Sequence, residues 1–408
     1  MKFPLLPAAV TALALLLGGC GDKGSSAEPP ANFKAIAADA SVILTWTAEP
    51  DVDYWIFYGP GETITTVNWA LSGGSVITKA TSPATIGGLT NGRTYSFTIN
   101  GRKDGGPGGP GAPTQVAVPR LSGTVWTVGT PLGTGMLNGV VNGNIATGYA
   151  DVFVGAGGTL YAGINGAAPA PVTNPVPAAD LNAVWYSTLG FVAAGANGTV
   201  LYSIDANTWT AQTSTTTATL YGGANAGIGG FVAVGAAGTI LLSSNGADWI
   251  AAASGTTNHL YGATFGNGRY VVVGANGTIL TTIDGTTWTA APSGTTRDLR
   301  SVAYAALVDA DSNVITRYVA VGAGGTILTS LDGTTWTAQA SVTTNDLAAI
   351  AYGGQFVAVG KGGVILTSLD GLAWETRTSG TPNDLNAVAR TVSGYTAVGA
   401  LGTNVTSF

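Results

Sequence analysis

The chain has 408 residues, 45% hydrophobic and only 9% charged, with 62 glycines, 10 tryptophans and a formal net charge of −6. The apolar content excludes an intrinsically disordered chain, and the mild negative charge excludes the clustered basic face that nucleic-acid binding requires. Because Cys20 is the only cysteine, a disulfide within the chain and a cysteine-based metal site are also excluded. Many glycines and threonines with few lysines and glutamates favour strands and tight turns.

The N-terminus has the pattern of an export signal. A short basic start precedes the apolar stretch 5–17, which is too short to span a membrane comfortably and leads into LGGC at 17–20. This ending resembles a bacterial lipobox, which implies a signal peptide over 1–19 and a lipidated Cys20. Several acyl chains anchor a protein stably, so we expect a cell-envelope lipoprotein on the outer membrane, facing the periplasm or the exterior. An ordinary secretory signal with a chance cysteine is the alternative, and residues 20–30 read as a flexible tether.

Residues 31–119 have the pattern of a small β-sandwich. The stretch SVILTWT at 41–47 alternates apolar and polar residues, with Trp46 facing a core, and YWIFYG at 54–59 is the next strand. The motif LTNGRTY at 89–95 resembles the tyrosine corner of fibronectin type III domains. The resemblance implies one such domain over the whole segment.

The rest of the chain is a repeat. Units of about forty residues carry the element G-T-[IV]-L or a near copy, which begins at Gly158, Gly198, Gly238, Gly277, Gly325, Gly363 and Gly402. Each unit holds four strand-like pieces, for example 347–353, 355–360, 364–368 and 373–379, and a glycine-rich turn that needs positive φ joins the second piece to the third. Four antiparallel strands per unit predict a β-propeller of seven blades over residues 120–408.

The two ends of the repeat region predict how the ring closes. The last unit stops at Phe408 after its third strand, whereas SGTVWTVGTP at 122–131 looks like a fourth strand without a unit, with Trp126 at the usual tryptophan position. Pairing of these ends would leave no open sheet. The predicted fold is therefore all-β, with a fibronectin type III sandwich followed by a seven-bladed propeller closed by its N- and C-terminal strands.

A second motif, S-x-D-G-x-x-W, recurs at the turn between the third and fourth strands. TTIDGTTWT at 281–289 and TSLDGTTWT at 329–337 are nearly identical copies. The motif resembles the Asp-box, or BNR repeat, of sialidases, xyloglucanases and photosystem II assembly factor propellers. Aspartate accepts backbone N–H groups in tight turns, and tryptophan supplies apolar area between blades. We therefore interpret eight residues as structural: Asp205, Asp284, Asp332, Asp370, Trp209, Trp288, Trp336 and Trp374.

Candidate binding residues lie in the loops that connect one blade to the next. SGTTNHL at 254–260 and SGTTRDL at 293–299 illustrate how alike these loops are. The candidates on this face are Asp180, His259, Asp298, Asp346, Asp384 and, in a neighbouring turn, Lys361. A ring of carboxylates at a channel mouth could bind a cation, a basic peptide or sugar hydroxyls, while the alternative is that these side chains bond to nearby backbone. Aromatic residues at the same end of the first strands are Trp185, Tyr186, Tyr221 and Tyr261, which favour glycan binding if exposed and are otherwise core.

Metal and cofactor sites are not predicted. His259 has no partner histidine, and the insertion containing Asp309, Asp311 and Asn313 lacks the glycine and glutamate of a calcium loop. No catalytic residue is assigned either, because Glu375, the only glutamate of the repeat region, falls on an outer strand.

These patterns favour a non-catalytic, envelope-anchored binding or assembly lipoprotein. Its membrane contact would be the lipidated cysteine, and its propeller face would meet a protein or glycan partner but not nucleic acid. The alternative is a glycoside hydrolase or a glycan-binding adhesin, since an inverting glycosidase needs only two carboxylates, and Asp346 and Asp384 fall on neighbouring blades. A purely structural surface protein is the third hypothesis.

Overall fold

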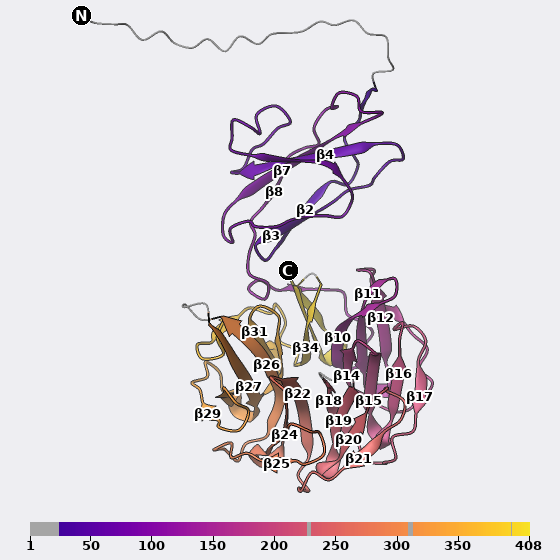
Figure 1. The fold of residues 1–408 in the computed structure, drawn as a ribbon, viewed down its shortest axis with the longest axis vertical. Coiled ribbons are helices and arrows are strands. Elements are labelled where there is room, and N and C mark those ends of the chain that lie inside the picture. Colours follow the sequence, from indigo (N-terminus) through magenta and orange to yellow (C-terminus); the bar gives the residue numbers. More distant parts are fainter. Residues whose placement is uncertain (1–23, 227–229, 309–312, 393) are drawn as a thin grey trace, which may run out of the picture. The chain divides into compact units, whose positions relative to one another are not determined.

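The computed structural model describes residues 24–226, 230–308, 313–392 and 394–408, which form an all-β chain of two compact units (Figure 1). The units are Met1–Pro119 and Arg120–Phe408. The expected signal peptide and Cys20 lie outside the described residues. None of the helices in the described part of the chain is long and apolar enough to cross a membrane.

The N-terminal unit consists of two antiparallel sheets. The larger sheet contains β1 (Ser26–Ala27), β7 (Tyr95–Arg102), β4 (Asp53–Pro60) and β5 (Ser75–Ala80), with β8 (Gln115–Ala117) also paired to β7. The smaller sheet contains β2 (Lys34–Ala38), β3 (Ser41–Thr45) and β6 (Ala84–Ile86). Ser26 and Ala27 pair with Arg102 and Gly101. The prediction of a flexible tether over residues 20–30 is therefore wrong for residues 26 and 27.

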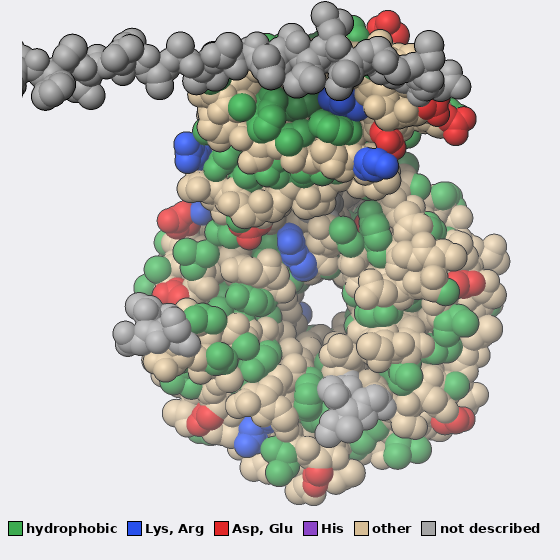
Figure 2. Space-filling view, turned by 45° about the horizontal axis from the view of Figure 1, so that its top comes forward, with side chains coloured by type: hydrophobic (Ala, Val, Ile, Leu, Met, Phe, Trp, Pro, Cys, Tyr) green, Lys and Arg blue, Asp and Glu red, His purple; other side chains and the backbone are tan. Residues whose placement is uncertain are grey.

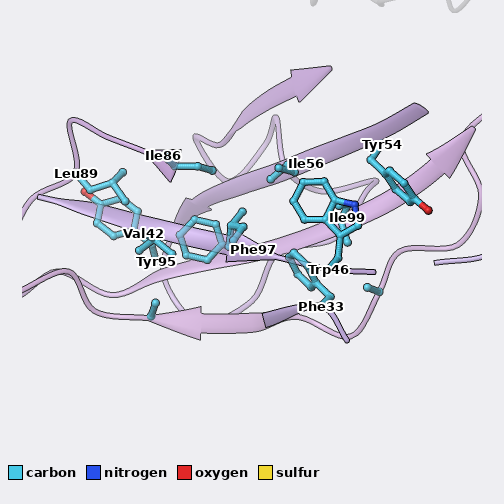
Figure 3. Packing of buried hydrophobic residues seen from close by; sticks show 13 residues of the cluster. Phe33, Val42, Trp46, Tyr54, Ile56, Ile86, Leu89, Tyr95, Phe97 and Ile99 are labelled. Carbon is cyan, nitrogen blue, oxygen red and sulfur yellow. The ribbon is translucent and has the colours of Figure 1, made fainter. Parts of the chain in front are cut away.

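Aromatic and aliphatic side chains fill the space between these two sheets (Figure 3). Trp46 is 6% exposed and packs edge-on against Tyr54, with ring centroids 5.7 Å apart. At the other end of the core, the hydroxyl of Tyr95 accepts the backbone N–H of Thr90 at 3.1 Å. The alternation of buried and half-buried residues along β3 is the pattern expected of a strand with one face on a core.

The second unit is built from seven four-stranded antiparallel sheets, each formed mainly by consecutive strands. The first three sheets contain β10 (Leu137–Ile145), β11 (Gly148–Gly155), β12 (Leu160–Ile164) and β13 (Ala170–Pro171); β14 (Leu181–Ser187), β15 (Gly190–Gly195), β16 (Val200–Ser203) and β17 (Thr210–Gln212); and β18 (Leu220–Ala226), β19 (Gly230–Gly235), β20 (Ile240–Ser243) and β21 (Ile250–Ala252). The next three contain β22 (Leu260–Gly266), β23 (Arg269–Gly274), β24 (Ile279–Thr282) and β25 (Thr289–Ala290); β26 (Leu299–Val308), β27 (Val314–Gly322), β28 (Ile327–Ser330) and β29 (Thr337–Ala338); and β30 (Leu347–Tyr352), β31 (Phe356–Gly360), β32 (Ile365–Ser368) and β33 (Glu375–Arg377). The seventh contains β34 (Leu385–Thr391), β35 (Gly394–Gly399), β36 (Asn404–Ser407) and β9 (Thr127–Val128).

The sheets are arranged as a closed ring around a central channel. The first strand of each sheet contacts the first strand of the next, and β34 contacts β10 in turn. Figure 2 shows the opening at the centre of this ring. Strand β9 pairs with β36, Val128 opposite Val405 and Thr127 opposite Thr406, which is the closure that the sequence predicts. This architecture is that of a β-propeller.

Local sequence explains how each sheet forms. The C-terminal parts of the second strands, and the whole of Phe356–Gly360, are buried because neighbouring sheets cover both of their faces, so they read as continuous apolar runs. A short 3-10 turn of three residues joins the second strand to the third, and its last two residues have positive φ, for example 62° at Gly157 and 70° at Gly158. These seven turns are η1 (Ala156–Gly158), η2 (Ala196–Gly198), η3 (Ala236–Gly238), η4 (Ala275–Gly277), η5 (Ala323–Gly325), η6 (Lys361–Gly363) and η7 (Ala400–Gly402).

Candidate binding site at the channel mouth

The aspartates of the S-x-D-G-x-x-W motif are used within their own turns. Asp332 Oδ1 accepts the N–H groups of Thr334 and Thr335, both at 2.8 Å, and the hydroxyl of Ser330 at 2.9 Å. The indole Nε1 of Trp336 donates to the carbonyl of Gly333 at 3.1 Å and so ties the turn to the core. The same bonds recur at Asp205, Asp284 and Asp370 and at Trp209, Trp288 and Trp374.

These bonds change the acidity of the motif's aspartates. The N–H of Thr287, the hydroxyl of Thr282 and the N–H of Thr286 hold the pKa of Asp284 well below its ordinary value. For Asp332, burial alone would raise the pKa, but the combined hydrogen bonds of the turn outweigh it and lower the pKa. Carboxylates held in the ionised form by their own backbone stabilise a turn and are poor proton donors.

The candidate residues of the connecting loops occupy equivalent positions in five of the sheets. Asp346 Oδ1 accepts the N–H of Gly324 in the preceding sheet at 2.8 Å, and its backbone carbonyl accepts the N–H of Lys361 in its own sheet at 2.9 Å. In four other connecting loops a side chain likewise accepts a backbone N–H of the preceding sheet, at 2.7 to 3.1 Å. The acceptor and donor residues are Asp180 and Gly157, His259 and Ala237, Asp298 and Asn276, and Asp384 and Gly362. Each of them therefore links two neighbouring sheets, which is the backbone-bonding role that the sequence left open as the alternative.

Two of these carboxylates also form ion pairs. Lys361 Nζ lies 2.9 Å from Asp346 Oδ2, and Arg300 Nη2 lies 3.1 Å from Asp298 Oδ2. The Gly324 N–H first, and then Lys361, lower the pKa of Asp346, and the hydrogen bond that Lys361 donates to Asp346 raises the pKa of Lys361. Across the described residues no three histidine, cysteine, aspartate or glutamate side chains gather closely enough to hold a metal ion, and Asp309 and Asp311 lie outside that part of the chain.

A β-bulge in every first strand builds the mouth of the channel. In each sheet the pairing register slips by one residue directly after the leucine that begins the strand, as between Leu299 and Ser301. The seven extra residues, which together we call the bulge ring, are Asn138, Asn182, Tyr221, Tyr261, Arg300, Ala348 and Asn386. All seven line one central recess of about 220 Å³. Bulges re-aim side chains in this way at functional rims of many sheets.

Three members of the bulge ring join neighbouring sheets. The side-chain amides of Asn138, Asn182 and Asn386 donate to the carbonyls of Leu181, Leu220 and Leu137 at 2.9 to 3.0 Å. The other four ring positions belong to consecutive sheets and carry no asparagine. These four residues, Tyr221, Tyr261, Arg300 and Ala348, are called the open sector below.

The open sector combines aromatic rings with a guanidinium. Tyr221 and Tyr261 have ring centroids 5.5 Å apart, and Arg300 Cζ lies 4.6 Å from the ring centroid of Tyr261. His259 packs edge-on against Tyr221 at 6.0 Å. Burial raises the pKa of the Tyr261 hydroxyl, and the nearby Asp298 carboxylate adds to the rise. Among the described residues that line the recess, Arg300 alone carries a charge.

The structure separates the aromatic candidates named from the sequence. Trp185 is 7% exposed and borders the recess, and Trp185 and Tyr186 both belong to core clusters that combine residues of neighbouring sheets. Tyr221 and Tyr261 are half-buried and line the recess. Sequence reasoning missed Arg300 and Ala348. Aligning the seven stretches LNG, LNA, LYG, LYG, LRS, LAA and LNA on their leucine would have found them, because the middle letter is the bulge residue.

Comparison with known proteins supports the fold. No family model and no curated protein sequence matches the chain. The solved structure of YCF48 from Cyanidioschyzon merolae is 16% identical with a TM-score of 0.55, covering 69% of this chain and 98% of that chain. YCF48 bound to D1 peptide is 17% identical with a TM-score of 0.54, covering 69% of this chain and 94% of that chain. At this identity the similarity shows a shared β-propeller fold.

Proposed function

We propose that this chain is a non-catalytic binding or assembly lipoprotein of a bacterial envelope, whose propeller presents the channel mouth to a protein partner. The open sector is the observation that carries the proposal. Four consecutive sheets place tyrosine, arginine or alanine where the other three place an asparagine that links sheets. Tyrosine and arginine are the residue types enriched where protein partners bind most tightly.

One comparison is compatible with a partner of this kind. A propeller of similar fold has been solved with a peptide bound to it. Because the identity is only 17%, the partner of that protein is not transferred to this chain.

We further propose that the seven sheets are the blades of an Asp-box propeller and that residues 31–119 form a fibronectin type III domain. Two sheets around Trp46 and the Tyr95–Thr90 hydrogen bond support the second assignment. Lipidation of Cys20 and envelope anchoring rest on the sequence motif.

The carboxylates support a non-catalytic role. Asp346 and Asp384 are the two carboxylates on which the glycoside hydrolase alternative depends. Each of them accepts a backbone N–H through Oδ1 at 2.8 Å. A general acid needs a raised pKa, whereas that of Asp346 is lowered. Glycan binding without hydrolysis is the second candidate, favoured by the half-buried rings of Tyr221 and Tyr261 at the mouth.

Photo-cross-linking in cells of the native host tests this function. The cross-linker p-benzoylphenylalanine replaces Tyr221 in the open sector or, as the matched control, Thr286 in an exposed turn of the Asp-box motif. We expect a discrete protein adduct from position 221 and none from position 286. Equal adducts from both positions, or none from position 221, would contradict a mouth-directed protein partner.

A further inference from the structure

We infer that a hydrogen-bonded turn of the N-terminal unit docks on a lipid bilayer and inserts the side chains of Val67 and Leu71 into it. The turn covers residues 66–73 and is called the apolar turn below. It belongs to the N-terminal unit and not to the propeller, so it adds a second surface to the partner site at the channel mouth. The inference rests on the proposed function in one respect, the lipidation of Cys20.

Two aliphatic side chains form the tip of the apolar turn. Val67 and Leu71 are the two most exposed large hydrophobic side chains among the described residues, at 85% and 93%, and neither belongs to the core of the unit. The N–H groups of Leu71 and Ser72 both donate to the Asn68 carbonyl, at 3.0 and 3.1 Å, which makes one helical turn. Because side chains four positions apart on such a turn project to one side, the two form a single apolar tip.

Hydrogen bonds at both ends hold the apolar turn in place. The hydroxyl of Thr65 accepts the Asn68 N–H at 3.0 Å, and Asn68 Oδ1 accepts the Thr65 N–H at 2.7 Å, which is the reciprocal pattern of a capping box. At the other end the Gly74 N–H donates to the Trp69 carbonyl at 2.8 Å. The ring of Trp69 packs on Phe57 with centroids 5.9 Å apart. A turn that is ordered before it meets its partner loses little conformational entropy on docking.

The apolar turn is packed on the outer face of the larger sheet. Phe57 of β4 pairs with Thr98 of β7, and both alternate along their strands with residues that fill the core on the other face. Trp69 of the turn covers Phe57, whereas the hydroxyl of Thr98 donates to the Ala112 carbonyl at 2.7 Å. The segment 103–112 therefore shares this face with the turn.

The segment 103–112 also connects the apolar turn with the start of the described chain. Gly111 packs directly against the Thr66 side chain of the turn. Gly109 packs against the Ala27 carbonyl of β1 so closely that a Cβ at this glycine would overlap it. The apolar turn and the strand at which the described chain begins are therefore joined across one side of the unit.

The anchor predicted from the sequence would bring this side to a membrane. Cys20 precedes Ser26 of β1 by six residues, and a stretch of this length spans at most about 22 Å. Acyl chains on Cys20 would keep the apolar turn near the bilayer, where a second contact forms at high effective concentration. Two aliphatic side chains are too few to bind a membrane stably by themselves, but they suffice to orient a domain that is already anchored.

The composition of the apolar turn favours lipid as the occupant. No charged residue occurs between Glu62 and Lys79, so inserting the tip buries no charge. Trp69, half-buried at the base of the turn, is of the residue type enriched where a membrane meets water. A rigid tip that protrudes from the surface suits a fluid acyl phase, which adapts to its shape without a matching groove.

Fluorescence on vesicles of phosphatidylethanolamine and phosphatidylglycerol tests the inference. The chain 20–408 with Cys20→Ser keeps every described residue, and a histidine tag at its first residue binds a nickel-chelating lipid in place of the acyl chains. Because Cys20 is the only cysteine, Leu71→Cys introduces a single thiol for NBD, a fluorophore that brightens in apolar surroundings. Ile36→Cys is the matched control, since Ile36 is exposed on the smaller sheet between two alanines that face the core.

We expect NBD at position 71 to brighten on the vesicles and to be quenched by doxyl-labelled lipid, and NBD at position 36 to do neither. Val67→Ser should lower the ratio of docked to undocked chains about tenfold, whereas Ile36→Ser should leave it unchanged. No change at position 71, or equal changes at both positions, would overturn the inference. Brightening that depends on protein concentration without vesicles would also overturn it and make the turn a contact between copies of the chain.

The outcomes also separate this inference from the proposed function. The tag holds the chain on the vesicle whether or not Cys20 is lipidated in cells, so a dark position 71 overturns the docking alone. A quenched position 71, combined with no acyl group on Cys20 or no protein adduct at position 221, keeps the docking surface and contradicts the proposed function instead. Thermal unfolding of each variant shows that a loss of docking is not a loss of fold.

Discussion

Replacing Asp346 tests the claim that the connecting-loop carboxylates join neighbouring sheets. Asp346→Ala removes the acceptor of the Gly324 N–H, which is partly buried, and an unsatisfied N–H of this kind costs about 1–3 kcal/mol. The ion pair with Lys361 contributes little, because the lysine side chain is 63% exposed and solvent screens it. Asp346→Asn keeps an oxygen acceptor and loses only the ion pair. We therefore expect the alanine variant to lose about 1–3 kcal/mol and the asparagine variant to stay close to the original chain.

The same bonds give this effect a pH dependence. The Gly324 N–H and then Lys361 lower the pKa of Asp346 in the folded state. Since the folded pKa lies below the unfolded value of about 3.9, the stabilisation is present above about pH 4 and is lost as the pH falls through the folded pKa. The difference in stability between the original chain and Asp346→Ala should therefore shrink as the pH falls below about 4.

Guanidinium chloride unfolding of the full chain, followed by tryptophan fluorescence at pH 7 and pH 3, measures both effects. The tryptophans of the Asp-box turns, including Trp336 and Trp374, report on the propeller. An asparagine variant as unstable as the alanine variant would refute the reasoning, because it would show that the acceptor is not what matters. So would a stability difference that stays constant between the two pH values.

Three further changes have expected outcomes. Asp332→Ala leaves two turn N–H groups without their acceptor and should lower the free energy of unfolding by about 1–2 kcal/mol at pH 7. The effect should be smaller at pH 3, because the pKa of Asp332 is lower in the folded than in the unfolded state. Thermal unfolding at both pH values checks this. Asn386→Ala breaks the bond to the Leu137 carbonyl that joins the last sheet to the first, so hydrogen exchange in β10 and β34 should accelerate, and unchanged exchange would argue against this link. Cys20→Ser should move the protein from the membrane fraction to the soluble fraction of the native host, whereas an unchanged distribution would exclude lipidation as the anchor.

The features that the sequence predicted are local or repeated. The turn chemistry of Asp332 and Trp336 involves residues within a few positions of each other, so one motif defines it. The pairing of β9 with β36 was predictable because the repeat left one strand missing and one strand spare. The start of the N-terminal unit was not predictable, since Ser26 pairs with Arg102, far along the chain, and nothing in the polar segment around it indicates a strand.

The binding site was harder to predict than the fold. The aspartates of the connecting loops drew attention because they repeat, yet repetition reflects their bonds to preceding turns, as for Asp384 and Gly362. Arg300 and Ala348 break the repeat and look unremarkable within LRS and LAA. Aligning the seven stretches on their leucine shows that these two positions differ between units, but only the pairing between strands identifies them as bulge residues that line the recess.

The central claim is that the open sector serves binding and not the fold, and thermal unfolding of a single variant tests it most directly. The variant places asparagine at all four open-sector positions, 221, 261, 300 and 348, so that every bulge residue can bond to the next sheet as Asn138 does. Each such hydrogen bond contributes about 0.5–1.5 kcal/mol. We expect a midpoint equal to or above that of the original chain. A midpoint several degrees lower would show that these four residues hold the fold, and binding would then not explain their presence.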